Sequence, residues 1–282
     1  MDYPKTAYQK VLTIAGSDSG GCAGIQADIK SISACGAYAA SVITATTAQN
    51  TQGVMDIHPI PIEHIAKQLE AVFSDIEFDA VKIGMLHSCE VIRTVAQKLV
   101  EYNVKNIVID PVIVATSGDL LINDNATINC LREFLPQAFL ITPNRKEAEI
   151  LSKVSISEDN AEASAKEIGL QFRTSVLLKG GHLENASQDI IDILYEYPSN
   201  KVSIIKSPKI DTKNTHGTGC SLSSSIATFL SKGHPLDHSV KKACKYISQA
   251  IHSGKDKTLG KGNGPIDHFI DSTIINLQTI KS

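Results

Sequence analysis

The chain has 282 residues, of which 42% are hydrophobic and 20% charged, a composition typical of a well-packed globular protein. Its formal net charge of −3 offers no basic surface for nucleic acid or for an anionic membrane. Residues 1–10 are polar, and no apolar run approaches the roughly 20 residues of a membrane helix, so we expect a cytoplasmic protein.

Apolar segments rich in β-branched residues alternate along the chain with amphipathic segments of helical period. Polar residues at 49–53 are expected to form a loop, and the last two strands are expected to pair antiparallel through a turn at 197–201. In chain order, the expected elements are a strand at 10–16, a helix at 25–36, a strand at 39–46, a helix at 61–76, a strand at 80–84, a helix at 91–99, a strand at 106–111, a helix at 129–135, a strand at 139–142, helices at 144–151 and 161–172, strands at 175–179, 189–195 and 202–207, and helices at 221–231 and 236–252.

This alternation predicts a single α/β domain over residues 1–282. No Gly-, Ser- or Pro-rich linker, internal repeat or low-complexity tract divides the chain. Strands that alternate with helices form a mostly parallel sheet with helices on both faces. Ligands of such sheets bind beyond the carboxyl ends of the strands, so the residues that follow each strand are the candidates for a site.

A polar, glycine-containing segment at 211–220 leads directly into the expected helix at 221–231. The backbone N–H groups of Gly217–Cys220 would point at one spot at the helix start, where the dipole is positive, and this favours a phosphate. The structural alternative is an ordinary helix entry, in which glycine permits a tight turn. Neither G-x-x-x-x-G-K-[ST] nor G-x-G-x-x-G occurs, which disfavours a Walker-type NTPase and a standard dinucleotide-dependent dehydrogenase.

Two carboxylates, an amide and a lysine follow expected strands and suggest a site for a hard cation and phosphate. Asp110 comes at a strand end, while Asn144 and Glu147 lie three residues apart at a helix start and so share one face. Mg²⁺ commonly takes one or two carboxylates together with waters and substrate phosphates. The alternative for Asn144 and Glu147 is a capping box, which their spacing favours by about two to one. Lys179, at another strand end, could reach a β- or γ-phosphate or equally be a solvated lysine.

Cys220 and Gln49 suggest the chemistry of a second ligand. The helix dipole is expected to lower the pKa of the Cys220 thiol, so that a thiolate could accept a substrate proton; the alternative is a small buried residue. The Gln49 carboxamide matches a ring nitrogen beside an exocyclic amine; the alternative is a surface-loop glutamine. His216 and His268 lie in glycine-rich loops, where solvated histidines are commoner than site residues. The six cysteines contain no C-x-x-C pair, which argues against a zinc ribbon but leaves a disulfide open.

Together these motifs resemble the hydroxymethylpyrimidine/phosphomethylpyrimidine kinases of thiamine biosynthesis, members of the ribokinase-like superfamily. The matching segments span nearly the whole chain in the order expected of that family. The longer ones are LTIAGSDSGGCAGIQAD, SVITATTAQNTQGV, VIDPVIVATSGD, LITPNRKEAE and IDTKNTHGTGCSLSSSIA. The shorter ones are AVKIGML, LLKGGH and LGKGNGPIDHF.

The resemblance implies a three-layer α/β/α sandwich around a mostly parallel sheet. It also implies phosphorylation of 4-amino-5-hydroxymethyl-2-methylpyrimidine by ATP, and then of the monophosphate to the diphosphate. Mg²⁺ would accompany ATP, and the resemblance leaves open whether a monovalent cation takes part. The implied ligands are small molecules, the expected assembly is a homodimer, and the loop at 259–265 is expected to close over the nucleotide.

The resemblance further implies roles for individual positions. Gly217, Thr218, Gly219 and Cys220 form the anion hole, with Cys220 in the place of the superfamily's usual catalytic aspartate. Gln49 falls on the family's pyrimidine-contacting glutamine. The other matching positions are Gly16, Met85 and Val112 for the pocket lining, Asp110, Asn144 and Glu147 for the magnesium and phosphate region, and Lys179 and Thr215 for the nucleotide side.

The chain departs from the family's pattern at two positions, and three other functions remain as alternatives. Cys22 replaces a usual glycine, and Thr116 stands where many members carry lysine. Close relatives phosphorylate pyridoxal, whose phenolic oxygen suits Gln49 less well than an aminopyrimidine does. A ligand-sensing relative without activity would be expected to lose the glycine cradle or the acidic residues, which are present here. A thiol-nucleophile enzyme lacks a histidine placed by motif beside Cys220.

Overall fold

The computed structural model describes residues 7–113, 122, 124–180 and 189–270, so Thr116 lies outside the described residues. The strands are β1 (Lys10–Asp18), β2 (Tyr38–Asn50), β3 (Gly53–Pro59), β4 (Ala80–Ile83), β5 (Ile107–Ile109), β6 (Leu140–Ile141), β7 (Ser175–Leu178), β8 (Asp189–Glu196) and β9 (Lys201–Pro208). The helices are α1 (Gly24–Ala34), α2 (Ile62–Phe73), α3 (Cys89–Glu101), α4 (Asn125–Phe134), α5 (Arg145–Ser152), α6 (Ala161–Phe172), α7 (Thr218–Ser231) and α8 (Leu236–Gly254), with a 3₁₀ turn at Leu135–Gln137.

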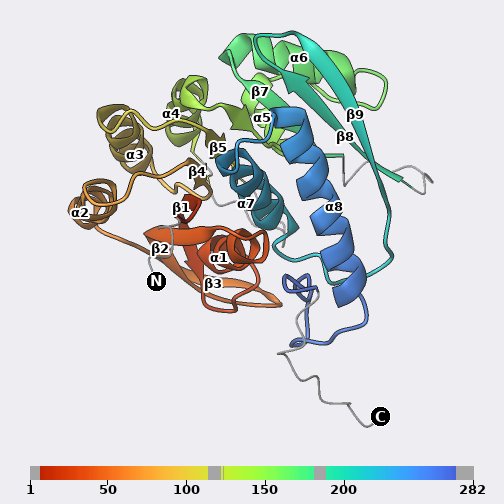
Figure 1. Cartoon of the computed structure of the whole chain (residues 1–282), viewed down its shortest axis with the longest axis horizontal. Helices are drawn as coiled ribbons and strands as arrows, with labels where there is room; N and C mark the ends of the chain where they lie inside the picture. Colours follow the sequence, from red (N-terminus) through yellow and green to blue (C-terminus); the bar gives the residue numbers. More distant parts are fainter. Residues whose placement is uncertain (1–6, 114–121, 123, 181–188, 271–282) are drawn as a thin grey trace, which may run out of the picture.

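The strands form one sheet in the order β3-β2-β1-β4-β5-β6-β7-β8-β9 (Figure 1). Strands β2, β1, β4, β5, β6 and β7 run parallel to one another. At the edges, β3 pairs antiparallel with β2, and β8 and β9 form an antiparallel extension beyond β7. The carboxyl ends of the parallel strands therefore meet along one edge of the sheet.

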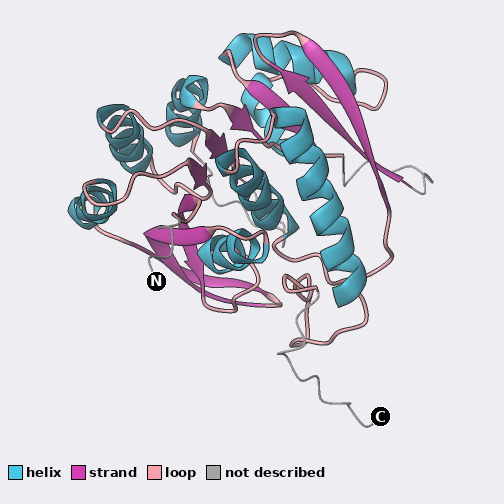
Figure 2. Cartoon of the chain, in the orientation of Figure 1, coloured by secondary structure: helices cyan, strands magenta, loops and turns pink. Residues whose placement is uncertain are grey.

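Helices cover both faces of the sheet and complete three layers (Figure 2). One hydrophobic core lies between the sheet and α2–α6, and the other lies between the sheet and α1, α7 and α8. Successive strand residues enter opposite cores, because side chains alternate between the faces of a strand: Leu12 and Ile14 enter the first core and Val11 the second. The predicted mostly parallel α/β/α sandwich is confirmed. Within the described ranges, no helix has the length and apolarity needed to cross a bilayer.

The sequence missed one strand at the sheet edge. Residues 49–53, expected to be a loop, instead include the end of β2, a two-residue turn and the start of β3. Gln49 lies opposite Val54, and Asn50 lies opposite Gly53. Polar residues can extend this hairpin because pairing satisfies the backbone groups whatever the side chains are. The prediction of a loop is therefore wrong, and Gln49 is held by a strand.

A buried ion pair ties four elements together. Lys82 of β4 and Asp28 of α1 have no exposed side-chain surface, and Lys82 Nζ lies 2.9 and 2.8 Å from the two Asp28 oxygens. Thr13 of β1 and Ser224 of α7 donate hydroxyl hydrogen bonds to the same carboxylate, at 2.6 and 2.7 Å. Burial alone would lower the pKa of Lys82, but the negative charges around it, that of Asp28 foremost, together with the hydrogen bonds to Asp28 raise that pKa. The ammonium therefore stays charged inside the protein.

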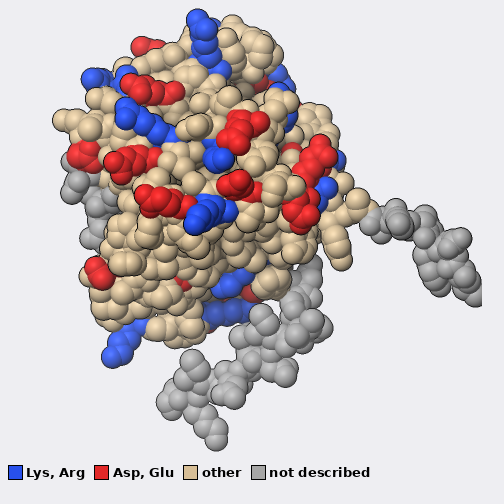
Figure 3. All heavy atoms as spheres, turned by 90° about the vertical axis from the view of Figure 1, so that its left-hand side faces the viewer, with Lys and Arg blue, Asp and Glu red and all other residues tan. Residues whose placement is uncertain are grey.

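Other ion pairs lie on the surface. Figure 3 shows the face that forms the left-hand side of Figure 1, where acidic and basic side chains are interspersed. On α3, for example, Lys98 Nζ lies 3.0 Å from a carboxylate oxygen of Glu101. Exposed pairs of this kind contribute about 0–1 kcal/mol to stability, because water screens the charges.

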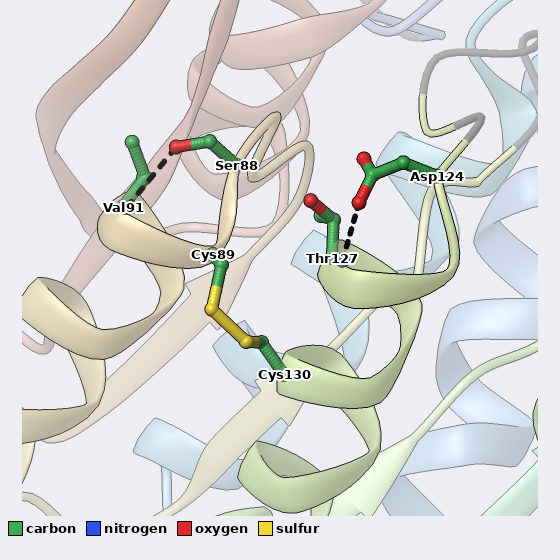
Figure 4. The surroundings of a disulfide bond; sticks show 6 residues. All are labelled: Ser88, Cys89, Val91, Asp124, Thr127 and Cys130. Atoms are coloured by element: carbon green, nitrogen blue, oxygen red, sulfur yellow. Dashed lines mark hydrogen bonds between the residues drawn. A yellow bond between two sulfur atoms is a disulfide. The ribbon is translucent and has the colours of Figure 1, made fainter.

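A disulfide joins α3 to α4 (Figure 4). Cys89 is the first residue of α3, and Cys130 lies in α4, with the two Cα atoms 5.4 Å apart. Ser88 and Asp124 cap the two helices by accepting hydrogen bonds from backbone N–H groups. The sequence neither predicted nor excluded this disulfide, because the spacing of six cysteines does not determine which of them pair.

Replacing Lys82 by methionine should lower the free energy of unfolding by roughly 3 to 5 kcal/mol, because the Asp28 carboxylate would stay buried without its counter-charge. Lys98→Met is the matched control and should change the free energy of unfolding by less than about 1 kcal/mol. Urea-induced unfolding followed by circular dichroism measures both. A Lys82→Met protein as stable as the wild type would contradict the role given to the ion pair.

Removing the disulfide should lower the free energy of unfolding by up to about 4 kcal/mol at 25 °C. This is the stabilisation expected when a cross-link that closes a loop of about 40 residues reduces the entropy of the unfolded chain. Cys89→Ser tests this, and Cys35→Ser, which removes a free thiol, is the control. A reducing agent should lower the thermal midpoint of the wild type and leave that of Cys89→Ser unchanged. Equal responses of both proteins to the reductant would argue against the bond.

Candidate active site

A pocket of about 830 Å³, counted to its open mouth, lies at the carboxyl ends of the parallel strands. Its walls come from the ends of β1, β2, β4, β5 and β7 and from the start of α7. The predicted residues in its lining are Gly16, Gln49, Met85, Asp110, Val112, Asn144, Glu147, Lys179, Gly217, Gly219 and Cys220. Two predicted residues, Thr215 and Thr218, are not in the lining; Thr218 Oγ1 instead donates to the Thr215 carbonyl at 2.7 Å.

The start of α7 forms one wall of the pocket as a cradle of backbone amides. Gly217 caps the helix with φ of 82°, and no side chain caps it. A Cβ at Gly217 would clash with the carbonyl oxygen of Cys22, so glycine is required both by conformation and by space. A Cβ at Gly219 would lie 3.4 Å from Lys179 Nζ and 3.6 Å from an Asp110 oxygen. The uncapped amides of the first turn therefore face a lysine and a carboxylate, a setting suited to phosphate.

Opposite the cradle lies a cluster of one lysine and two carboxylates. Lys179 Nζ donates to Asp110 Oδ1 at 2.8 Å, and Thr142 Oγ1 donates to the same oxygen at 3.0 Å. Burial alone would lower the pKa of Lys179, but Asp110 and Glu147 raise it, so the ammonium is charged. The alternative of a solvated lysine is wrong, since only 16% of the Lys179 side chain is exposed.

Asn144 and Glu147 form the capping box that their spacing favoured, and they also line the pocket. Asn144 Oδ1 accepts from the Glu147 N–H at 3.0 Å, and Glu147 Oε2 accepts from the Asn144 N–H at 2.8 Å. Burial raises the pKa of Glu147 to about 7; the Lys179 charge opposes this rise, and the Asp110 charge adds to it. Burial is thus the main reason that the Glu147 carboxyl holds its proton more tightly than usual.

The structure changes the expectation for Cys220. The residue is half-buried on the pocket wall, at the start of α7. Burial raises the pKa of its thiol to about 11, and although the Lys82 charge lowers it, the charges of Asp28 and Asp110 add to the rise. The predicted lowering of this pKa is therefore wrong, because burial is the largest influence on the thiol.

Gln49 lines the pocket near the end of β2. Its backbone N–H donates to Ser19 Oγ at 2.9 Å, and its carbonyl accepts from the same hydroxyl at 2.8 Å. Its carboxamide contacts Thr47 Oγ1 at 3.1 Å and His216 Nε2 at 3.2 Å. The alternatives of a surface-loop glutamine and a solvated loop histidine are therefore wrong: His216 is only 7% exposed.

No specific role was predicted for Asp18 or Lys82 from the sequence, although both line the pocket. The Asp18 carboxylate accepts N–H bonds from Gly20, Cys22 and Ala23 at 2.8 to 2.9 Å and so shapes the loop after β1. Burial would raise the pKa of Asp18, but these bonds and the contact with His216 lower it. The sequence signals are an Asp-Ser-Gly-Gly turn after the first strand and a lysine inside an apolar strand.

The loop at 259–265 lies against the β2–β3 hairpin. The Asn263 N–H donates to the Thr51 carbonyl at 3.0 Å, and the Gly262 N–H donates to Thr51 Oγ1 at 3.1 Å. The Gly264 carbonyl accepts from the His216 N–H at 3.0 Å. The loop thus borders the Gln49 end of the pocket in this structure. Its closure over a nucleotide stays a prediction.

The family model described as phosphomethylpyrimidine kinase matches residues 18–267 of this chain. The hydroxymethylpyrimidine/phosphomethylpyrimidine kinase of Rhizobium meliloti is 44% identical over 261 residues, which cover 92% of this chain and 96% of that protein. A thiamine biosynthesis bifunctional protein of Geobacter sulfurreducens is 48% identical over 262 residues, which cover 92% of this chain and 52% of that protein. The chain therefore spans about half the length of this bifunctional relative.

Solved structures agree with these relatives. The phosphomethylpyrimidine kinase of Clostridium difficile superposes with a TM-score of 0.75 at 42% identity, over 86% of this chain and 99% of that one. An ADP complex of Bacillus subtilis pyridoxal kinase superposes with a TM-score of 0.82 at 33% identity, over 93% of this chain and 98% of that one. The match to the family model and these relatives, over a fold and a pocket with the expected parts, confirms the resemblance: the chain belongs to the phosphomethylpyrimidine kinase family.

Proposed function

We propose that this chain is a single kinase domain that transfers the γ-phosphoryl group of ATP to 4-amino-5-hydroxymethyl-2-methylpyrimidine and then to its monophosphate, in thiamine biosynthesis or salvage. The observation that carries the proposal is the convergence of three parts in one pocket. These parts are the amide cradle at the start of α7, the Lys179–Asp110–Glu147 cluster, and the Gln49 carboxamide. The names of the relatives support the same substrates.

The residues of the pocket fit Mg²⁺. Among the described residues no cluster of three or more His, Cys, Asp or Glu could hold a metal, so any divalent ion must share its ligands with substrate phosphates and water. Asp110 and Glu147 both line the pocket and would supply the hard oxygen ligands that Mg²⁺ prefers. Bound there, Mg²⁺ would neutralise phosphate charge. We also include a monovalent cation and a homodimer in the proposal. Only the resemblance to the family supports these two.

The chain's own groups supply positioning and charge. The amides of Gly219 and Cys220 would bind the oxygens of the transferred phosphoryl group, while Lys179 would balance its charge. The substrate hydroxyl oxygen forms the new bond to phosphorus as the bond to the ADP oxygen breaks. In the first step the hydroxyl proton must leave. Cys220 lines the pocket, but its thiol, whose pKa is raised, would have to lose its own proton before it could receive this one. In the second step the acceptor phosphate is already ionised.

A second candidate is pyridoxal kinase activity, as the main or a side reaction, and the likeness to pyridoxal kinase structures favours it. Gln49 favours the aminopyrimidine, because its carboxamide matches an amine beside a ring nitrogen.

Measuring kcat/KM for both alcohols with ATP and Mg²⁺ tests the proposal, with a higher value expected for the pyrimidine. A higher value for pyridoxal would reverse the assignment. Binding of the pyrimidine without any ATP consumption would show a ligand sensor instead.

Cys220→Ser should slow the first phosphorylation about tenfold or more and the second much less. The reason is that only the first step removes a hydroxyl proton, and phosphoryl transfer asks little of a base. Single-turnover rates for the alcohol and for its monophosphate measure the two steps separately. Equal losses in both steps would count against proton acceptance by Cys220.

Gly219→Val should slow both steps by about 10² to 10³, the range for losing one donor to a developing anion. Its branched side chain would press against Lys179 Nζ and the Asp110 carboxylate, which lie 3.4 and 3.6 Å from the position of its Cβ. Gly219→Ala is the matched control and should be far milder, because its Cβ would meet these neighbours at 3.4 and 3.6 Å, ordinary contact distances. A fully active Gly219→Val enzyme would place phosphoryl transfer elsewhere.

A further inference from the structure

Lys179 needs support from the backbone that carries it. Its Nζ lies 2.8 Å from Asp110 Oδ1 and 3.4 Å from the position that a Cβ on Gly219 would take, so the ammonium is close to both the carboxylate and the amide cradle. A lysine side chain is a flexible stem, and the ammonium keeps such a place only if the backbone below it is fixed. The bonds of the chain around residue 179 are therefore part of the site.

The backbone pairing between β7 and β8 ends one residue before Lys179. Among the described residues, the last pair on this side is Leu178 with Ile193. On the side of β6, the Lys179 N–H donates to the Pro143 carbonyl at 2.9 Å. Support from β8 must therefore come from a contact of another kind.

Asp192 of β8 supplies that contact through its side chain. Its Oδ1 accepts a hydrogen bond from the Gly180 N–H at 2.8 Å. Strand β8 passes so close to Gly180 that a Cβ there would clash with the Ile191 carbonyl oxygen, so the approach requires glycine. The residue directly after Lys179 is thus tied to β8 by a carboxylate instead of a backbone carbonyl.

Asp192 lies where a carboxylate is unfavourable. It faces the same core as Leu194, between the sheet and α8, and it is only 7% exposed. Burial raises the pKa of Asp192, although the Gly180 N–H and the charge of Lys179 oppose the rise. Cys244 of α8 approaches the other oxygen, with its Sγ 3.8 Å from Oδ2. An apolar residue would fill this place without the cost of desolvation, so what the carboxylate adds is its hydrogen bond to Gly180.

We propose that Asp192 is a positioning residue for phosphoryl transfer, which holds the Lys179 ammonium beside the amide cradle by accepting the Gly180 N–H. The inference rests on the proposed function and deepens it. Asp192 does not line the pocket, so it acts on the transferred group only through Lys179.

Three variants test the hydrogen bond. Asp192→Leu removes the acceptor at similar volume and should lower kcat for both phosphorylation steps about tenfold or more, because Lys179 loses its fixed place. Asp192→Asn keeps an oxygen that can accept from Gly180 and should retain kcat within about threefold of the wild type. Leu194→Ala is the control for stability: it opens a cavity in the same core, so it should destabilise the fold and still keep kcat within about threefold. Steady-state rates and urea-induced unfolding of each variant measure both effects.

A double-mutant cycle shows whether Asp192 acts through Lys179. In a Lys179→Met background, Asp192→Leu should lower the remaining kcat by less than about twofold, because the group that it positions is gone. A role in the fold alone would give the same factor in both backgrounds and would overturn the inference. An Asp192→Leu enzyme with the kcat of the wild type, or an Asp192→Asn enzyme as slow as Asp192→Leu, would overturn it as well.

These outcomes are distinct from a failure of the proposed function. A wild type that phosphorylates neither the pyrimidine alcohol nor its monophosphate would refute the function. If Asp192→Leu does not fold, hydrogen exchange of the wild type decides. The Gly180 N–H should exchange slowly, because it is bound to a buried carboxylate, and exchange at the rate of a free amide would overturn the inference.

Discussion

The buried ion pair of Lys82 and Asp28 is the interaction on which the rest of this structure depends. Lys82, Thr13 and Ser224 all donate to one carboxylate, so a single side chain of α1 links β1, β4 and α7. A charge at this depth is tolerated because its oxygens are paired and hydrogen-bonded. The pair sets α7, whose start makes the amide cradle, at a defined place relative to the strand ends.

The pocket combines a charged cluster with a hydrogen-bonding carboxamide. Asp110, Glu147 and Lys179 lie beside the cradle, and no side chain caps the amides there. Gln49 contacts His216, which also lies 3.8 Å from the Asp18 carboxylate. The charged cluster suits polyphosphate transfer, and the Gln49 carboxamide suits selection of the acceptor.

Local sequence pattern predicted much of this fold, and long-range contacts explain what it missed. Helix α6 has the predicted ends because its apolar residues repeat with helical period up to Phe172. Strand β3 was missed because an edge strand can be polar. The sequence shows Lys82 inside an apolar strand but not its partner on α1, 54 residues away. The sequence shows that Cys220 stands at a helix start, whereas the burial that raises the pKa of its thiol depends on the whole pocket.

The contact between Thr51 and the loop at 259–265 bears on the order in which the protein is made. The hydrogen bond from Gly262 to Thr51 spans 211 residues, so the wall beside Gln49 cannot be finished until the chain beyond α8 has left the ribosome. His216, which the same loop holds, gains its backbone partner at that moment. Residues 217–220 of the cradle precede this loop in the chain, so they leave the ribosome before the wall beside Gln49 can be completed.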